Sequence, residues 1–155
     1  MSAAHPKIAD YPFTTLVPNL GVVAYGDAEP FVMADIPGLI EGAHKGAGLG
    51  FRFLRHIERT KIILHVVDIS GVSLDKPLQP WHKIETELRS YSEAFMGKKR
   101  VIALNKIDLL PDEEKLQAII GAYQSLGVPV CAVSALTKKG LPELARVLVR
   151  LLGSN

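Results

Sequence analysis

Cysteine is almost absent from this sequence. Cys131 is the only one among 155 residues, so the chain cannot form an internal disulfide, and its apolar setting, "PVCAVSA", indicates a buried structural thiol rather than a nucleophile. Long apolar runs are lacking as well, since no segment reaches the roughly 18 apolar residues that a membrane helix needs. The first residues, "MSAAHPKIADYPF", show no basic segment followed by an apolar signal core. We therefore expect a cytoplasmic protein without a membrane span.

The sequence also has little excess of charge of either sign. Its formal net charge of +2 arises from 18 Lys and Arg against 16 Asp and Glu, so bulk electrostatics does not by itself indicate binding to nucleic acid. Hydrophobic residues make up 48% of the chain, which is enough to fill the core of one domain of this length. We expect a single domain and a monomer.

What the sequence does contain is an alternation of strand-like and helix-like segments. Apolar, β-branched runs typical of strands buried on both faces, which are usually parallel, occur at residues 31–36, 61–70, 100–105 and 128–135. Apolar residues at helical spacing occur at 51–60, 80–95, 111–127 and 139–153. Pro111 with Asp112 is expected to open the third helix, and Gly127 to close it. The alternation predicts a doubly wound α/β domain with a mostly parallel sheet and helices on both faces.

Short polar signatures follow three of the predicted strands. They are "DIPG" at 35–38, "NKID" at 105–108 and "SAL" at 134–136. In open α/β sheets the ligand binds outside the carboxyl ends of the strands. We therefore expect these three segments to line one crevice.

The second signature has the chemistry of guanine recognition. The Asp108 carboxylate can accept hydrogen bonds from the ring N–H and the exocyclic amine of guanine, whereas adenine offers neither donor there. Asn105 can tie neighbouring loops together and reach the base, the Lys106 stem can lie across the face of the base, and the N–H of Ala135 can donate to the guanine carbonyl. The alternative is that "NKID" is an ordinary polar turn between a strand and a helix.

The first signature suggests a metal site when it is combined with "DYPFTT" at 10–15. A threonine hydroxyl from this proline-broken stretch could ligate Mg²⁺ while Asp35 holds the same ion through water. Two alternatives remain. Asp35 could simply cap the next helix, and Thr14 and Thr15 could belong to a loop that leads into a strand at 16–25.

Together these segments resemble a known family, the Obg (CgtA) GTPases. The resemblance is carried by "KIADYPFTTLVPNLGVV", "DIPGLIEGAHKGAGLGFRFLRHIERT", "NKIDLL" and "VSAL", and it covers nearly the whole chain. The long second segment is the most specific. The resemblance implies a Ras-like P-loop GTPase G domain that binds GTP and GDP with Mg²⁺. It also implies a role in assembly of the large ribosomal subunit, with that subunit and its rRNA as partners.

The resemblance also assigns roles to individual residues. It makes 13–17 the first switch, with Thr15 as the Mg²⁺ ligand, and 35–38 the second switch. Leu39 stands where many small GTPases place a water-orienting Gln, which implies slow hydrolysis; no catalytic residue is assigned. The implied nucleotide-binding residues are Phe13, Thr14, Thr15, Leu16, Val17, Asp35, Ile36, Pro37, Gly38, Asn105, Lys106, Ile107, Asp108, Ser134, Ala135 and Leu136.

The sequence departs from the family pattern in one respect. It contains no G-x-x-x-x-G-K-[ST] stretch, whose N–H groups and Lys bind phosphates. The family places that loop and its strand just before the residues that match 2–13, so we expect 1–155 to be a partial G domain without the first strand and P-loop. Two hypotheses follow: a slow GTP-hydrolysing switch, or a non-hydrolysing truncated remnant that acts as a binding module.

Overall fold

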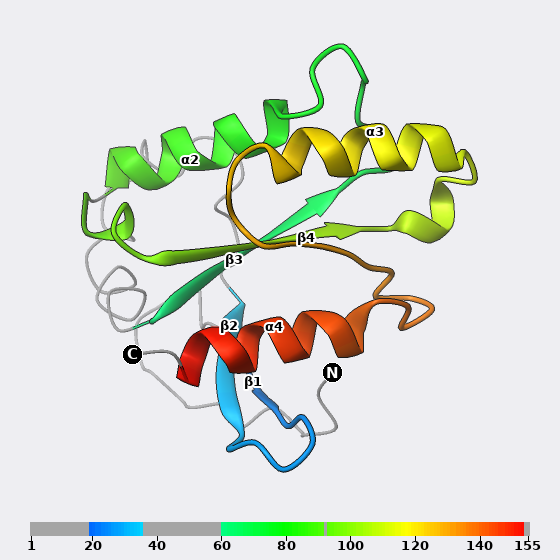
Figure 1. Cartoon of the computed structure of the whole chain (residues 1–155). Coiled ribbons are helices and arrows are strands. Elements are labelled where there is room, and N and C mark those ends of the chain that lie inside the picture. The colour runs from blue at the N-terminus through cyan, green and yellow to red at the C-terminus, as the bar shows by residue number, and fades with distance from the viewer. Residues whose placement is uncertain (1–18, 36–59, 92, 154–155) are drawn as a thin grey trace.

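A computed structural model describes residues 19–35, 60–91 and 93–153 (Figure 1). An antiparallel sheet pairs β1 (Asn19–Val23) with β2 (Phe31–Asp35). A parallel sheet has the order β3 (Ile62–Asp68), β4 (Lys99–Asn105) and β5 (Val130–Ala132). The helices are α2 (Gln79–Tyr91), α3 (Glu113–Gln124) and α4 (Leu141–Gly153), with short 3₁₀ helices η2 (Glu93–Phe95) and η3 (Ile107–Leu109).

The core is built around β4, which pairs with β3 on one edge and β5 on the other. Successive side chains of a strand point to opposite faces, so β4 contributes to two hydrophobic clusters. One cluster joins Ile102 and Leu104 to α2 and α3, and the other joins Val101 and Ala103 to α4. Helices therefore cover both faces of this sheet, as predicted (Figure 1).

Cys131 on β5 belongs to the cluster beneath α4. Its side chain is buried and unpaired, and burial raises the pKa of its thiol. The expected structural thiol is therefore confirmed. Within the described ranges, none of the helices is long and apolar enough to span a membrane.

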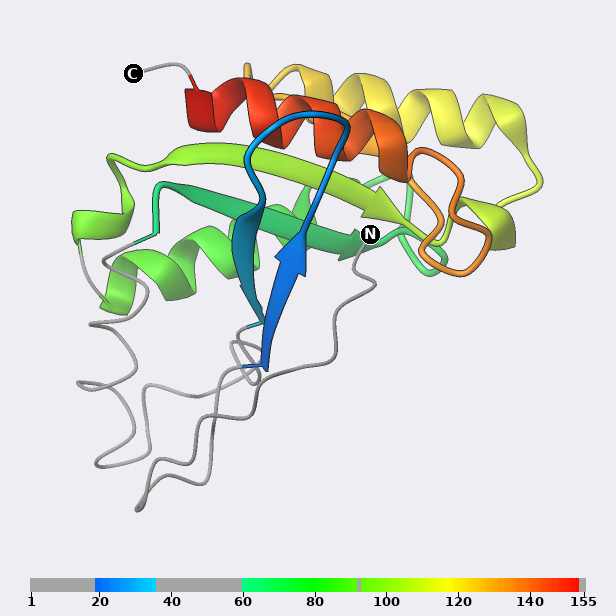
Figure 2. The same cartoon turned by 90° about the horizontal axis from the view of Figure 1, so that it is seen from below.

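The β1–β2 hairpin differs from what the sequence predicted. We expected 31–36 to be a parallel strand buried on both faces, but β2 is antiparallel to β1 and Val32 is 65% exposed. The connection between the two strands is too short for the crossover that parallel pairing requires. One face of the hairpin, with Phe31 and Met33, packs against the cluster beneath α4, and Figure 2 shows the hairpin beside that helix.

The other predicted elements that fall within the described residues agree with the structure apart from their ends. Asp112 caps α3, because its side chain accepts a hydrogen bond from the Lys115 N–H at 2.9 Å. Gly127 follows the end of that helix with φ +71°, the left-handed conformation that glycine adopts cheaply. The strand expected at 128–135 is shorter, Val130–Ala132. The helix predicted at 51–60 lies, except for Thr60, outside the described residues.

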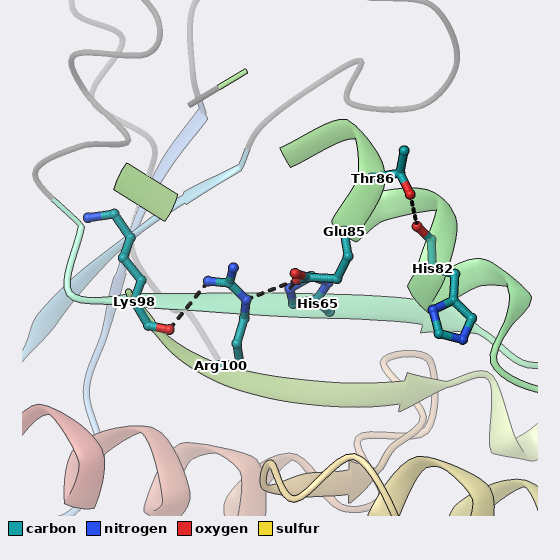
Figure 3. Close-up of polar contacts among 6 residues, drawn as sticks. All are labelled: His65, His82, Glu85, Thr86, Lys98 and Arg100. Atoms are coloured by element: carbon teal, nitrogen blue, oxygen red, sulfur yellow. Dashed lines mark hydrogen bonds and ion pairs between the residues drawn. The ribbon is translucent and has the colours of Figure 1, made fainter. Parts of the chain in front are cut away.

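His65 is a buried polar side chain on β3, beneath α2 (Figure 3). Its ring packs against Trp81 with centroids 4.5 Å apart, and its Nε2 lies 3.2 Å from Glu85 Oε1. Neither ring nitrogen makes a hydrogen bond of adequate geometry within the described part of the chain. Glu85 Oε1 instead accepts a hydrogen bond from Arg100 Nε at 2.9 Å. Burial lowers the pKa of His65 to about 4, with Glu85 raising it and Arg100 lowering it further.

We expect this histidine to make folding sensitive to mild acid. The imidazole titrates near 6.5 in the unfolded chain and about 4 in the folded one, so the unfolded state binds the extra proton between these values. The free energy of unfolding therefore keeps its full value above pH 6.5 and falls as the pH is lowered. The loss due to His65 is about 3 kcal/mol at pH 4. Urea denaturation at stepped pH measures this slope.

Two variants isolate the contribution of His65. His65→Leu should flatten the slope, because it removes the titrating ring from the core. His82→Gln should leave the slope unchanged, since His82 is exposed on α2, the helix that covers His65. Equal slopes in wild type and His65→Leu would show that other groups cause the acid sensitivity.

Gly140 connects the loop after β5 to α4 and lies close against the end of β5. Its φ is +74°, and a Cβ on it would overlap the carbonyl oxygen of Ala132. Gly127 has a similar φ of +71°, but an added Cβ there would meet nothing within 4 Å. The two glycines therefore separate the cost of a left-handed backbone from the cost of a steric clash.

We expect Gly127→Ala to lower the free energy of unfolding by about 1 kcal/mol, because alanine is strained in the left-handed region. Gly140→Ala should lose a further ~1–3 kcal/mol, because the added methyl group pushes the loop away from β5. Urea denaturation of both variants gives the comparison. Equal losses would mean that the loop can move without cost.

Candidate functional site

The carboxyl ends of β3, β4 and β5 lie side by side, because these strands are parallel neighbours. Beyond β5, the Val133 N–H donates to the Leu104 carbonyl at 2.8 Å, and the Ile107 N–H donates to the Val133 carbonyl at 3.3 Å. These bonds hold the segments 105–108 and 134–136 at the same edge of the sheet. The structure thus brings two of the three predicted signatures together.

The segment after β4 presents Asp108 to solvent. Lys106 has φ 69° and ψ 35°, a left-handed conformation that turns the chain into η3. Ile107 is only 8% exposed and anchors this turn in the core, whereas Asp108 is exposed. Among the described residues, no hydrogen bond or ion pair engages the Asp108 carboxylate. Its oxygens are available to accept hydrogen bonds from a ligand.

The loop after β5 is held by its own polar groups. Ser134 is fully buried; its hydroxyl accepts a hydrogen bond from the Thr137 N–H at 3.0 Å, and its N–H donates to the Lys139 carbonyl at 2.9 Å. Ala135 and Leu136 are exposed, the latter by 82%. The loop therefore has a buried anchor and an exposed tip.

A direct hydrogen bond joins the two segments. Asn105 Oδ1 accepts from the Ala135 N–H at 3.0 Å, so Asn105 ties neighbouring loops together, as we expected. The same bond occupies the N–H that we expected to donate to a guanine carbonyl. A backbone donor takes the nearest acceptor when no ligand is present, so a base that uses this N–H must share it with Asn105 or displace Asn105.

Polar side chains also follow β3, where the sequence analysis predicted no site. Asp68 stands opposite Asn105 in the ladder, and its Oδ2 lies 2.5 Å from Lys106 Nζ. Ser70 donates to Asp68 Oδ1 from both its N–H, at 3.0 Å, and its hydroxyl, at 2.6 Å. Its signal in the sequence is an Asp-x-Ser at the end of an apolar run, a pattern that by itself predicts only the end of a strand.

The predicted metal and switch residues lie mostly beyond what the structure describes. Asp35 is exposed at the end of β2, opposite Asn19. Ile36, Pro37 and Gly38 lie outside the described residues, as do Phe13, Thr14, Thr15, Leu16 and Val17. Within the described ranges, no group of three or more His, Cys, Asp or Glu side chains is placed to hold a metal ion.

Two family models match the chain. The model of the 50S ribosome-binding GTPases matches residues 1–106, and that of the RsgA GTPases matches residues 72–152. Together they include both polar segments at the edge of the parallel sheet.

Curated relatives of high identity are named GTPase Obg. The protein of Syntrophobacter fumaroxidans is 63% identical over 155 residues, which is 100% of this chain and 44% of the relative. That of Alkaliphilus metalliredigens is 51% identical over 144 residues, which is 93% of this chain and 34% of the relative. The chain therefore spans less than half the length of these two relatives.

Solved structures of lower identity share the fold. Aquifex aeolicus Era bound to GDP and AlF₄⁻ has a TM-score of 0.68 and 19% identity, with 96% of this chain and 48% of that one covered. The GDP form of the cytosolic domain of the T. maritima FeoB iron transporter has a TM-score of 0.64 and 22% identity, with 100% and 56% covered. The Ras-like α/β G-domain fold is confirmed, and the chain belongs to the Obg family of GTPases.

Proposed function

We propose that this chain is the guanine-nucleotide-binding part of an Obg-type GTPase, with the base held between segments 105–108 and 134–136. The observation that carries the proposal is the exposed Asp108 carboxylate, which no described residue engages and which the buried Ile107 holds in place. A carboxylate there pairs with the two adjacent donors of guanine. Adenine would leave it desolvated and unpaired, which is the kind of penalty that produces strong discrimination.

The neighbouring groups complete the pocket in this proposal. When guanine enters, its carbonyl oxygen competes with Asn105 Oδ1 for the Ala135 N–H, whose present bond is 3.0 Å long. The amide group of Asn105 is then free to reach the ring of the base. The four-carbon stem of Lys106 lies across one face of the base, and the exposed Leu136 supplies apolar surface beside it.

Asp108→Asn tests the base site directly. We expect guanosine 5′-monophosphate, and not adenosine 5′-monophosphate, to shift the backbone amide signals of Lys106 and Ala135 in a nitrogen-15 NMR titration of the chain. Asp108→Asn should weaken guanine binding by ~10-fold or more, because an acceptor of two bonds becomes partly a donor. The same variant should gain affinity for xanthosine 5′-monophosphate, whose extra carbonyl accepts from the new amide.

Asp112→Asn is the matched control, because Asp112 caps α3 through the Lys115 N–H. It should lower stability slightly and leave the preference for guanine intact. If Asp108→Asn binds guanine as tightly as wild type does, the pocket lies elsewhere.

A Mg²⁺ ion fits this proposal, with Asp35 and Thr15 as its protein partners. The Asp35 carboxylate is exposed at a strand end, and carboxylate and hydroxyl oxygens are the hard ligands that Mg²⁺ prefers. Mg²⁺ keeps several waters and binds mainly through phosphates, so it does not require a cluster of acidic side chains. When bound, the ion would neutralise charge on the phosphates. The first switch, segment 13–17, and the second switch, segment 35–38, would contact the nucleotide.

Two modes of action remain for the chain as given, and its own sequence favours the second. A slow GTP-hydrolysing switch is what the Obg relatives suggest, with Leu39 in place of a water-orienting Gln. A partial G domain that binds without hydrolysis is supported by the lack of a G-x-x-x-x-G-K-[ST] stretch in these 155 residues.

We expect the 155-residue chain to release phosphate from GTP with Mg²⁺ no faster than buffer does. The reason is that its sequence contains no G-x-x-x-x-G-K-[ST] stretch, the kind of loop that cradles the transferred phosphate. A fluorescent phosphate sensor makes the measurement, and the Asp108→Asn variant controls for contaminating enzymes. Release that is above buffer and is lost in Asp108→Asn would establish the hydrolysing switch instead.

We further infer that the parent protein acts on the large ribosomal subunit and its rRNA, in the cytoplasm, as a monomer. The ribosomal role is supported by the match to the 50S ribosome-binding GTPases. The single buried, unpaired Cys131 suits a reducing compartment.

A further inference from the structure

The Asp68 carboxylate at the end of β3 has partners on both oxygens. Oδ1 accepts hydrogen bonds from the Ser70 N–H at 3.0 Å and from its hydroxyl at 2.6 Å. Oδ2 lies 2.5 Å from the ammonium of Lys106. These hydrogen bonds lower the pKa of Asp68 to about 2, with Lys106 as the largest cause, so the group stays charged at any pH near neutrality.

Lys106 belongs to the proposed guanine pocket, and its backbone is held from several sides. Its φ of 69° is unusual for a residue other than glycine and needs support from its surroundings. The support comes from adjacent backbone bonds: Ile69 donates to the Asn105 carbonyl at 3.1 Å, and Ile107 to the Val133 carbonyl at 3.3 Å. With its Cα fixed at the tip of β4 and its ammonium at the tip of β3, the Lys106 stem spans the gap between two strand ends.

We propose that Asp68 is a positioning residue for guanine recognition, which holds the Lys106 ammonium so that the side-chain stem is ordered before the base arrives. Ser70 assists by fixing the orientation of the Asp68 carboxylate. The inference rests on the proposed function, because the base is taken to lie beneath that stem.

The physical basis of this role is pre-organisation. A lysine side chain has four flexible bonds, and ordering it at the moment of binding reduces affinity. Asp68 orders it beforehand. The side chains of Lys106 and Asp68 are 48% and 49% exposed, so solvent screens the pair and the effect is modest. An exposed pair of this kind corresponds to about a two- to fivefold change in affinity.

A double-mutant cycle tests the proposal with guanosine 5′-monophosphate as the probe, in the NMR titration described above. Asp68→Asn should weaken binding about two- to fivefold in the wild-type background. It should have no effect in a Lys106→Met background, because methionine keeps an unbranched stem without the ammonium. High salt should bring wild type towards Asp68→Asn, whereas a purely structural role of Asp68 would not depend on salt in this way.

A control variant and a second measurement distinguish positioning of Lys106 from other effects of Asp68. Asp75→Asn removes an exposed carboxylate that lies soon after β3 and should leave binding unchanged. Carbon-13 relaxation of the Lys106 methylene groups, measured without nucleotide, should show an ordered stem in wild type and a mobile one in Asp68→Asn. A mobile stem in wild type, or an equal effect of Asp68→Asn in both backgrounds, overturns the proposal. An ordered stem without selectivity for guanine would overturn the proposed function and leave the pairing of Asp68 with Lys106 in place.

Discussion

The rest of the described structure depends on the parallel pairing of β4 with a neighbour on each edge. Both edges of β4 are paired and helices cover both of its faces, so the four residues Val101–Leu104 are almost completely buried. Their alternating side chains pack against a helical layer on each face. The same pairing fixes where three strands end. Asp68 stands opposite Asn105, and the chain beyond β5 bonds back to Leu104. The position of the candidate site is thus a consequence of strand register.

The site divides its residues between anchoring and recognition. Ile107 and Ser134 are buried and hold the two loops to the sheet, whereas Asp108, Ala135 and Leu136 reach solvent. Groups that are fixed by a rigid neighbour lose little further freedom when a ligand binds. In the proposed function, this arrangement would let a small set of exposed atoms discriminate between bases without contributing to the core.

Patterns in the sequence predicted the features that depend on residues close together in the chain. Contacts between distant segments became known only from the structure. The strand expected at 100–105, observed as Lys99–Asn105, and the cap at Asp112 could be predicted because each depends on neighbours in sequence. The direction of β2 could not be predicted from its apolar residues, since the short connection to β1 decides it. Asn105, Lys106 and Asp108 form one contiguous signature, so their grouping was visible. The pairing of Asp68 with Lys106 and the bond from Ala135 to Asn105 arise only when separate strands come into register.

If guanine binds here as proposed, the hydrogen bond between Asn105 and Ala135 limits what base binding can contribute to affinity. A guanine carbonyl that takes the Ala135 N–H replaces an existing bond, so the net gain is the difference between two similar interactions. Asp108 has no such bond to exchange within the described structure, but it gives up hydration when a base arrives. In the proposed site, adenine would leave it unpaired at a cost, whereas guanine supplies both donors. In the proposed function, this edge of the sheet would determine which base is accepted, and the strength of nucleotide binding would come mainly from contacts to the phosphates.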